Sequence, residues 1–397
     1  CAPQDAADHL AGLDDTDPEH LLDLVDVALA AGADGDDLLV LRARLLADVG
    51  RSEEARELLL PRVAAEPLSE FLAAGATRAF WNDDTSLQRV AELLAAHQPI
   101  LSAWALANLA FRRRDFAETE RQCRVILDLD PTAVNTWRLR ADAARAMGNH
   151  IDELAHRLAV LQHSDPVDPM DRWQLLVPAT IWGEWDLVRE QLPFLDLHPQ
   201  SSQGPISEHW GYVTITYPDG GSPDIVAQRT GPVSAIIRGV LAWDDEQQYG
   251  DEVVFAPGFL DERPADADDP DTDWRPLFAH VCTVREGRYR SQPVTGPYPG
   301  DDAWEAVRSK LGDCDLVRAD HLYELFDQQR GHKVPAVWAQ LLIPPTITDA
   351  QADALLTAAT ADLEDPLFWW ELADEAGGDT RLHAERGKRY GRKYPGV

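Results

Sequence analysis

Cysteine is scarce in this chain of 397 residues, and the four present, Cys1, Cys123, Cys282 and Cys314, form no CxxC pair and no tight cluster. Disulfide-stapled domains and structural zinc sites need closely spaced cysteines, so the sequence argues against both. Hydrophobic runs of about 18 residues are also missing. The sequence therefore predicts no membrane-spanning segment.

Positive charge is the second shortage. The chain has 36 basic residues against 69 acidic ones, a formal net charge of −33, and lysine occurs only at Lys310, Lys333, Lys388 and Lys393. A surface this negative repels phosphate backbones and anionic membranes. General binding of nucleic acid or membranes is therefore disfavoured, whereas a basic partner is compatible with the charge.

Known catalytic and phosphate-binding motifs are missing as well. The sequence contains no GxGxxG after a strand, no GxxxxGK[ST], no HExxH and no GxSxG. We therefore expect no cofactor and no resident metal. The absence of motifs favours a non-catalytic protein and leaves the question of catalysis open.

What the first half does contain is a repeat. Breaks that end in proline recur after 32, 32, 35 and 33 residues, and a second series of turn signals lies midway between them. The proline series is Pro67, Pro99, Pro131, Pro166 and Pro199; the turn series is Gly50-Arg51, Asn82-Asp83, Arg114-Asp115, Gly148-Asn149 and Gly183-Glu184. Two interleaved series of one period predict a helix, a tight turn, a second helix and a linker, used repeatedly.

The period and residue types of this half are similar to the tetratricopeptide repeat. The clearest unit follows that family's pattern of large, small, large, Gly, Ala, large and Pro at Leu39, Ala43, Leu46, Gly50, Ala55, Leu59 and Pro67. The resemblance covers residues about 3–199 and implies about six helix pairs, the first including a helix from Glu19 to Ala30 opened by Asp17-Pro18. It also implies an all-α solenoid with a concave groove that binds a segment of another protein.

Candidate groove residues come from the first helix of each pair. They are Arg42, Asn108, Arg112, Arg138 and Arg145. A row of arginine side chains along the groove suits an acidic tail of a partner protein. Two alternatives stay open: these arginines are solvated or pair with nearby carboxylates, or the solenoid only docks against the second domain.

After a linker of composition Ser201-Ser202-Gln203-Gly204-Pro205, the pattern changes to strands. Expected strands cover 212–217, 224–230, 233–241, 252–256, 277–285, 288–294, 316–319 and 337–343, with a hairpin turn at 218–221. Expected helices cover 301–311, 348–361 and a segment opened by Pro366. This predicts an α+β domain over 207–397 with a mainly antiparallel sheet and a ferredoxin-like centre. The stretch from about 210 to 345, with Gly250-Asp251-Glu252-Val253-Val254, faintly resembles uncharacterised bacterial α+β domains.

The second domain offers one pair of reactive side chains. His280 and Cys282 stand two residues apart in an expected strand, so both are expected on one face, where Cys is a candidate nucleophile or ligand and His a base. The alternative is a half-buried sheet in which Cys282 is a small core residue. The His209-Trp210 region is a second candidate for a small-molecule site.

Two charged segments are further candidates for binding. The acidic loop 261–273 has carboxylates at alternate positions, as calcium requires, but lacks the Gly and Glu of an EF-hand; the alternative is a solvated loop. The basic tail 381–397, with Tyr390 and Tyr394, suits nucleic acid, or else folds back on the acidic body.

We therefore predict a protein-interaction scaffold: the repeat groove binds a partner segment and the α+β domain presents a second binding surface. An enzyme or small-ligand domain recruited by the repeats is one alternative, and an acidic mimic that inhibits a nucleic-acid-binding protein is another. The expected location is the cytoplasm. Because the sequence starts at Cys1, a lipid anchor through that residue is the alternative.

Overall fold

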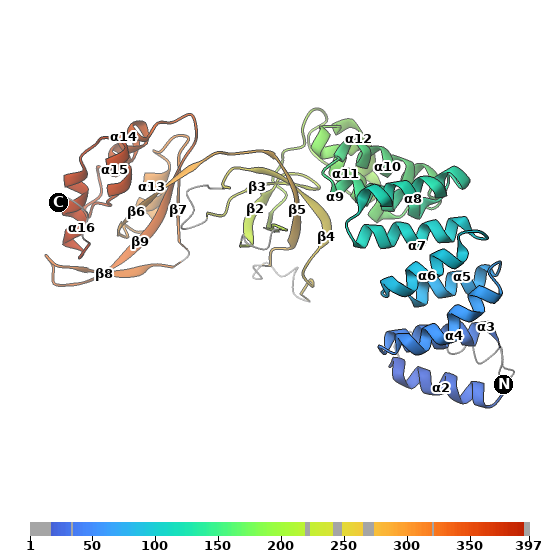
Figure 1. The fold of residues 1–397 in the computed structure, drawn as a ribbon. Coiled ribbons are helices and arrows are strands. Elements are labelled where there is room, and N and C mark those ends of the chain that lie inside the picture. The colour runs from blue at the N-terminus through green and yellow to red at the C-terminus, as the bar shows by residue number, and fades with distance from the viewer. Residues whose placement is uncertain are drawn as a thin grey trace. The chain divides into compact units, whose positions relative to one another are not determined.

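The computed structural model describes residues 17–32, 35–218, 223–240, 248–264, 274–319 and 321–392. The chain divides between Pro178 and Ala179 into two compact units. The first is helical, and the second contains the strands (Figure 1). In the described residues no helix is both long and apolar enough to cross a bilayer.

Successive helices stack along the first unit (Figure 1). Their bounds are α2 Pro18–Ala30, α3 Asp36–Asp48, α4 Ser52–Ala65, α5 Glu70–Ala79, α6 Asp84–Leu94, α7 Pro99–Arg112, α8 Phe116–Leu129, α9 Val134–Ala146, α10 His150–His163 and α11 Pro169–Trp182. The last of these continues past the division, and α12 Trp185–Gln191 and η1 Leu192–Leu195 follow in the second unit. Neighbours pack in the order expected of helix pairs: α3 against α4, α7 against α8, and α9 against α10.

The turns inside these pairs lie where the sequence places them. Gly50 and Gly148 have φ of 80° and 70°, in the left-handed region that glycine enters without a steric cost. The following helices begin with side-chain caps, for example Asp115 on the Glu118 N–H and Asn149 on the Asp152 N–H. The predicted alternation of helix, tight turn and helix is therefore confirmed for the described residues.

Two details at the helix starts qualify that result. The helix expected from Glu19 starts one residue earlier, at Pro18, with Asp17 as its cap. Pro99, expected to mark a linker, is the first residue of α7, where a missing N–H costs nothing. Most of the remainder of the expected first pair lies outside the described residues.

After η1, the second unit forms a closed barrel of five strands. Their bounds are β1 Tyr212–Thr216, β2 Ile225–Arg229, β3 Ser234–Ile237, β4 Glu252–Phe259 and β5 Leu277–Arg285. Sequential neighbours pair antiparallel, but β1 and β5 close the barrel in parallel. An up-and-down meander with an odd number of strands must close this way, because its first and last strands run in the same direction.

A second sheet follows, of four strands in the order β6-β9-β7, with β8 also paired to β9. The strands are β6 Arg290–Pro297, β7 Asp315–Arg318, β8 Tyr323–Asp327 and β9 His332–Ile343, and the helices are α13 Asp301–Arg308, α14 Asp349–Ala359, α15 Trp370–Glu375 and α16 Thr380–Arg389. The prediction of strands and helices in this half is confirmed, and among the described residues every strand pair except β1–β5 is antiparallel. The single sheet with a ferredoxin-like centre is not found, because the strands divide between a closed barrel and a separate antiparallel sheet. The sequence analysis also missed β8 and α16, which are only five and ten residues long.

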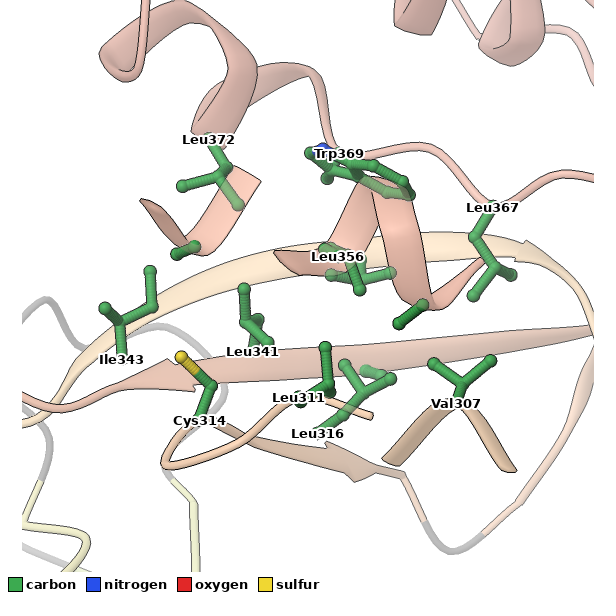
Figure 2. Packing of buried hydrophobic residues seen from close by; sticks show 14 of the residues in the cluster. Val307, Leu311, Cys314, Leu316, Leu341, Ile343, Leu356, Leu367, Trp369 and Leu372 are labelled. Carbon is green, nitrogen blue, oxygen red and sulfur yellow. The ribbon is translucent and has the colours of Figure 1, made fainter. Parts of the chain in front are cut away.

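Helices cover the second sheet and share its core (Figure 2). Leu316 and Leu341 come from the strands, Leu356 from α14, and Trp369 precedes α15. The cap predicted at Thr348 is present as a complete capping box. The helix expected at Pro366 starts only at Trp370, because Phe368 instead pairs its backbone with Thr295 of β6.

The basic tail folds back on this unit as far as it is described. The Arg389 guanidinium binds the buried carboxylate of Asp327 and holds its pKa well below the usual range. The aromatic face of Tyr390 is buried and stacked on Phe368, so its predicted use as an exposed base-stacking face is wrong. Tyr394 and the other residues 393–397 lie outside the described residues.

A buried histidine makes the stability of this unit depend on pH. The Nδ1 of His383 accepts the Trp369 N–H at 3.3 Å, and burial lowers its pKa to about 4, against about 6.5 when unfolded. The unfolded chain therefore binds more protons between these values, so stability is complete above pH 6.5 and falls as the pH drops towards 4. We expect a loss of about 1–2 kcal/mol after solvent screening.

Urea unfolding followed at pH 7, 6, 5 and 4 measures this loss. His383→Gln keeps an acceptor for the Trp369 N–H but does not titrate. The difference in unfolding free energy between the two proteins measures the contribution of the His383 imidazole. It is separate from that of the carboxylates, which titrate at lower pH. If the unfolding free energies of both proteins changed with pH in the same way across this range, the prediction would be contradicted.

Candidate partner-binding groove

Three helices of the first unit enclose an open groove of about 1050 Å³. We call it the α3–α5–α7 groove. Its lining residues are Asp37, Val40, Leu41, Arg44 and Asp48 of α3, Phe71, Ala74, Gly75, Thr77 and Arg78 of α5, Trp81 after α5, and Leu101 and Trp104 of α7. These are first helices of successive pairs, the helices that the repeat resemblance assigns to a concave surface.

Helical periodicity places one row of side chains from each helix in the groove. On α3 the sequence Asp37, Val40, Leu41, Arg44 and Asp48 follows helical spacing along one face. The opposite side of the same helix carries core residues such as Ala43 and Leu46. One helix therefore serves both the core and the groove.

Gly75 sets how closely α3 and α5 approach. A Cβ at this position would lie 2.5 Å from Cγ1 and 2.7 Å from Cγ2 of Val40. The two helices touch because residue 75 has no side chain. The floor of the groove depends on this contact.

The groove exposes large apolar surface. Phe71 is 49% exposed, an unusual state for a phenylalanine, and Trp81 and Trp104 are only half-buried. Aromatic side chains at such positions supply most of the binding energy in protein interfaces. The arrangement suits a partner that brings its own apolar side chains.

Four charged residues line the same groove. Asp37 and Asp48 are exposed, at the two ends of α3, while Arg44 lies half-buried between them. Arg78 is exposed on α5. Across the residues that the structure describes, neither Arg44 nor Arg78 forms an ion pair or a side-chain hydrogen bond.

The groove residues predicted from sequence mostly have internal partners. The Nε of Arg42 binds Asp26 at 2.6 Å, and Arg112 binds Asp84 at 2.9 Å while its guanidinium lies 5.6 Å from the centre of the Trp81 ring. Asn108 is buried and donates to the Trp104 carbonyl. None of these three lines the α3–α5–α7 groove.

The last two predicted residues lie further along the unit. Arg138 forms a two-bond ion pair with Asp171, at 2.9 and 2.6 Å. Arg145 binds Glu153 at 2.6 Å and the side chain of Gln174 at 2.6 Å. The four predicted arginines therefore pair with carboxylates of the same chain, which is the alternative left open above.

A signal for the groove arginines was present in the sequence. Arg44, Arg78, Arg112 and Arg145 lie 34, 34 and 33 residues apart, once per repeat. Periodicity identifies this series but does not show which members find a carboxylate. The structure separates two paired arginines from two in the groove.

The candidate pair in the second unit is divided by a β-bulge. His280 pairs with Phe255 and Cys282 with Val254, so two steps on β5 match one step on β4. Adjacent residues of β4 point to opposite faces, so His280 and Cys282 do not share a face as expected. His280 stacks on Tyr217 with ring centres 4.4 Å apart, and its Nε2 lies 3.1 Å from the Thr283 hydroxyl.

The remaining candidates are partly described. His209 packs edge-on against Tyr212, and the guanidinium of Arg229 lies over Trp210. Asp261, at the start of the acidic loop, accepts from the indole of Trp274 and the Leu277 N–H, whereas 265–273 lie outside the described residues. Among the residues that are described, no three His, Cys, Asp or Glu side chains form a metal-binding group.

Comparison with known proteins gives a weak structural similarity. No family model matches the chain. No curated protein matches it. Among solved structures, the chain is similar to a mutant form of MamA, with 17% identity and a TM-score of 0.29, over 41% of this chain and 95% of that chain. A TM-score this low identifies neither a common fold nor a common function.

Proposed function

We propose that this protein is an interaction scaffold whose tetratricopeptide-like first unit binds a segment of another protein in the α3–α5–α7 groove. The observation that carries the proposal is the groove itself, with an exposed Phe71 and two half-buried tryptophans along an open volume of about 1050 Å³. The chemistry of these residues is that of a binding surface.

Energetics favour an apolar anchor in the bound segment. Each large apolar side chain removed from water contributes about 1.5–3 kcal/mol. The Phe71 ring and a partner side chain inserted between α5 and α7 would both be desolvated on binding. A few such contacts are enough for a micromolar complex.

We further propose that the limits predicted from sequence, 1–199 and 207–397, separate this binding domain from a second one with its own contact surface. Phe259 and Leu260 follow one another at the end of β4 and are 56% and 57% exposed. Phe259 packs against Trp274 and Phe278, which fixes its orientation. Adjacent exposed apolar residues supply part of such a contact surface.

Site-specific cross-linking tests the groove. A photoreactive amino acid at position 48, on the exposed rim, should capture a discrete protein when the intact chain is irradiated in lysate of the source cells. The same group at position 57, on the exposed surface of α4, should not. Adding Phe71→Ala to the position-48 protein should reduce the cross-link about tenfold, because one apolar anchor is lost.

Mass spectrometry of the cross-linked peptide identifies the bound segment. Equal capture from positions 48 and 57, or a cross-link that survives Phe71→Ala unchanged, would refute binding in the groove. Circular dichroism of each variant controls for unfolding.

A further inference from the structure

We propose that the bound segment is acidic as well as apolar, with a carboxylate that bridges Arg44 and Arg78 beside a large side chain held by the groove aromatics. This inference rests on the proposed function, because it assigns the partner chemistry of the same groove. The occupant is a segment of another protein that contains Asp or Glu next to an aromatic or large aliphatic residue.

By helical spacing, Arg44 and Arg78 stand at the same level of neighbouring helices. Helices α3 and α5 run in the same direction, because the chain reverses once between α3 and α4 and again between α4 and α5. Val40 of α3 meets Gly75 of α5. Arg44 follows Val40 by four residues and Arg78 follows Gly75 by three, so both are about one helical turn beyond the contact.

Arg44 and Arg78 differ from the four arginines predicted for the groove because, in the described part of the chain, no carboxylate pairs with them. Arg42, Arg112, Arg138 and Arg145 each bind an acidic side chain of this chain. Arg44 and Arg78 line the groove instead, in a sequence that carries 69 acidic residues. A half-buried guanidinium offers up to five donors in a planar fork that matches a carboxylate.

The acidic residues of the groove do not cancel this site. Asp37 lies in the first turn of α3, where the helix N-terminus offsets negative charge, and Asp48 is the last residue of α3; both are exposed to water. Neither approaches Arg44 or Arg78 within ion-pairing distance. The centre of the groove is therefore basic and its ends are acidic.

Aromatic residues flank the basic centre. Trp81 follows Arg78 by three residues, and Phe71 precedes it by seven, so all three belong to one face of α5 and its extension. A carboxylate on the arginines thus places adjacent side chains of the segment over these rings. Apolar surroundings exclude water and strengthen the ion pair.

Selection from a random library of displayed twelve-residue peptides, against the intact chain, tests the inference. We expect the enriched peptides to carry Asp or Glu within three residues of an aromatic residue or leucine. Arg44→Gln and Arg78→Gln should each weaken a synthetic peptide of this class about tenfold, since a charge-assisted hydrogen bond is lost. Arg89→Gln, an exposed arginine of α6 outside the groove, is the matched control and should change affinity less than about twofold.

Exchanging the charges of the arginine and the peptide tests the ion pair directly. Arg44→Glu should reject the acidic peptide and bind its Lys-substituted counterpart more tightly than the unaltered chain does. If peptides lose binding on Phe71→Ala but prove neutral or basic, the proposed function stands and this inference is overturned. If no enriched peptide depends on Phe71, both are overturned.

Discussion

Replacing Glu153 by alanine should destabilise the helical unit by about 3–5 kcal/mol, the cost of removing the buried carboxylate of an ion-pair network, although Arg157 keeps its pair with Asp142. The Glu153 side chain has no exposed surface and binds Arg145 at 2.6 Å and the His150 Nδ1 at 2.9 Å. Arg157, 3% exposed, lies 3.9 Å away, and burial lowers its pKa. Without the carboxylate, the two guanidiniums, one from α9 and one from α10, repel one another in a poorly hydrated space.

Hydrogen exchange of the amides in α9 and α10 measures this loss without requiring that the whole chain unfold in one step. Glu57→Ala, an exposed glutamate of α4, is the matched control and should change stability by less than about 0.5 kcal/mol. Glu153→Gln should fall between the two, because it keeps one acceptor. A cost below about 1 kcal/mol for Glu153→Ala would mean that the carboxylate does not balance the arginines.

Gly75→Ala should both destabilise the first unit and close the groove to its partner. The new methyl group would lie 2.5 Å from Val40, whose β-branched side chain has one strongly preferred rotamer in a helix. Overpacking of this kind costs about 1–3 kcal/mol, whereas alanine gains about 1 kcal/mol of helix propensity. We expect a net loss of up to about 2 kcal/mol and a clear loss of the position-48 cross-link.

The double variant Val40→Ala with Gly75→Ala separates packing from propensity. Its two small side chains fit the space of one valine, so stability and cross-linking should return close to those of the unaltered chain. A coupling energy of at least about 1 kcal/mol is expected from the four unfolding curves. Additive effects would show that α3 and α5 do not meet at this contact.

The variants at Glu153 and Gly75 separate effects on stability from effects on partner binding. Glu153 lies outside the α3–α5–α7 groove, so its loss should lower stability more than binding at a temperature where the unit stays folded. Gly75 lies in the groove floor, so its substitution should affect binding more than stability.

The sequence predicted the helical half well because its signals are local. Glycine at Gly50 and Gly148, caps such as Asn149 and a period of 32–35 residues each act within one turn or one pair of the chain. The strands of the second unit were also placed largely correctly, and β5 has the predicted bounds Leu277–Arg285. Alternation along a strand does not, however, say which strand lies beside it.

By itself, the sequence determined the helix pairs, the change to strands after the linker and the strongly negative charge. The tertiary structure alone decided that five strands close into a barrel, that a bulge between β4 and β5 separates His280 from Cys282, and that Arg42 has an acidic partner while Arg44 faces the groove. The physical reason is the range of the forces involved. Turns, caps and helical periods depend on neighbours in the chain, whereas strand closure and ion pairing depend on residues that only folding brings together.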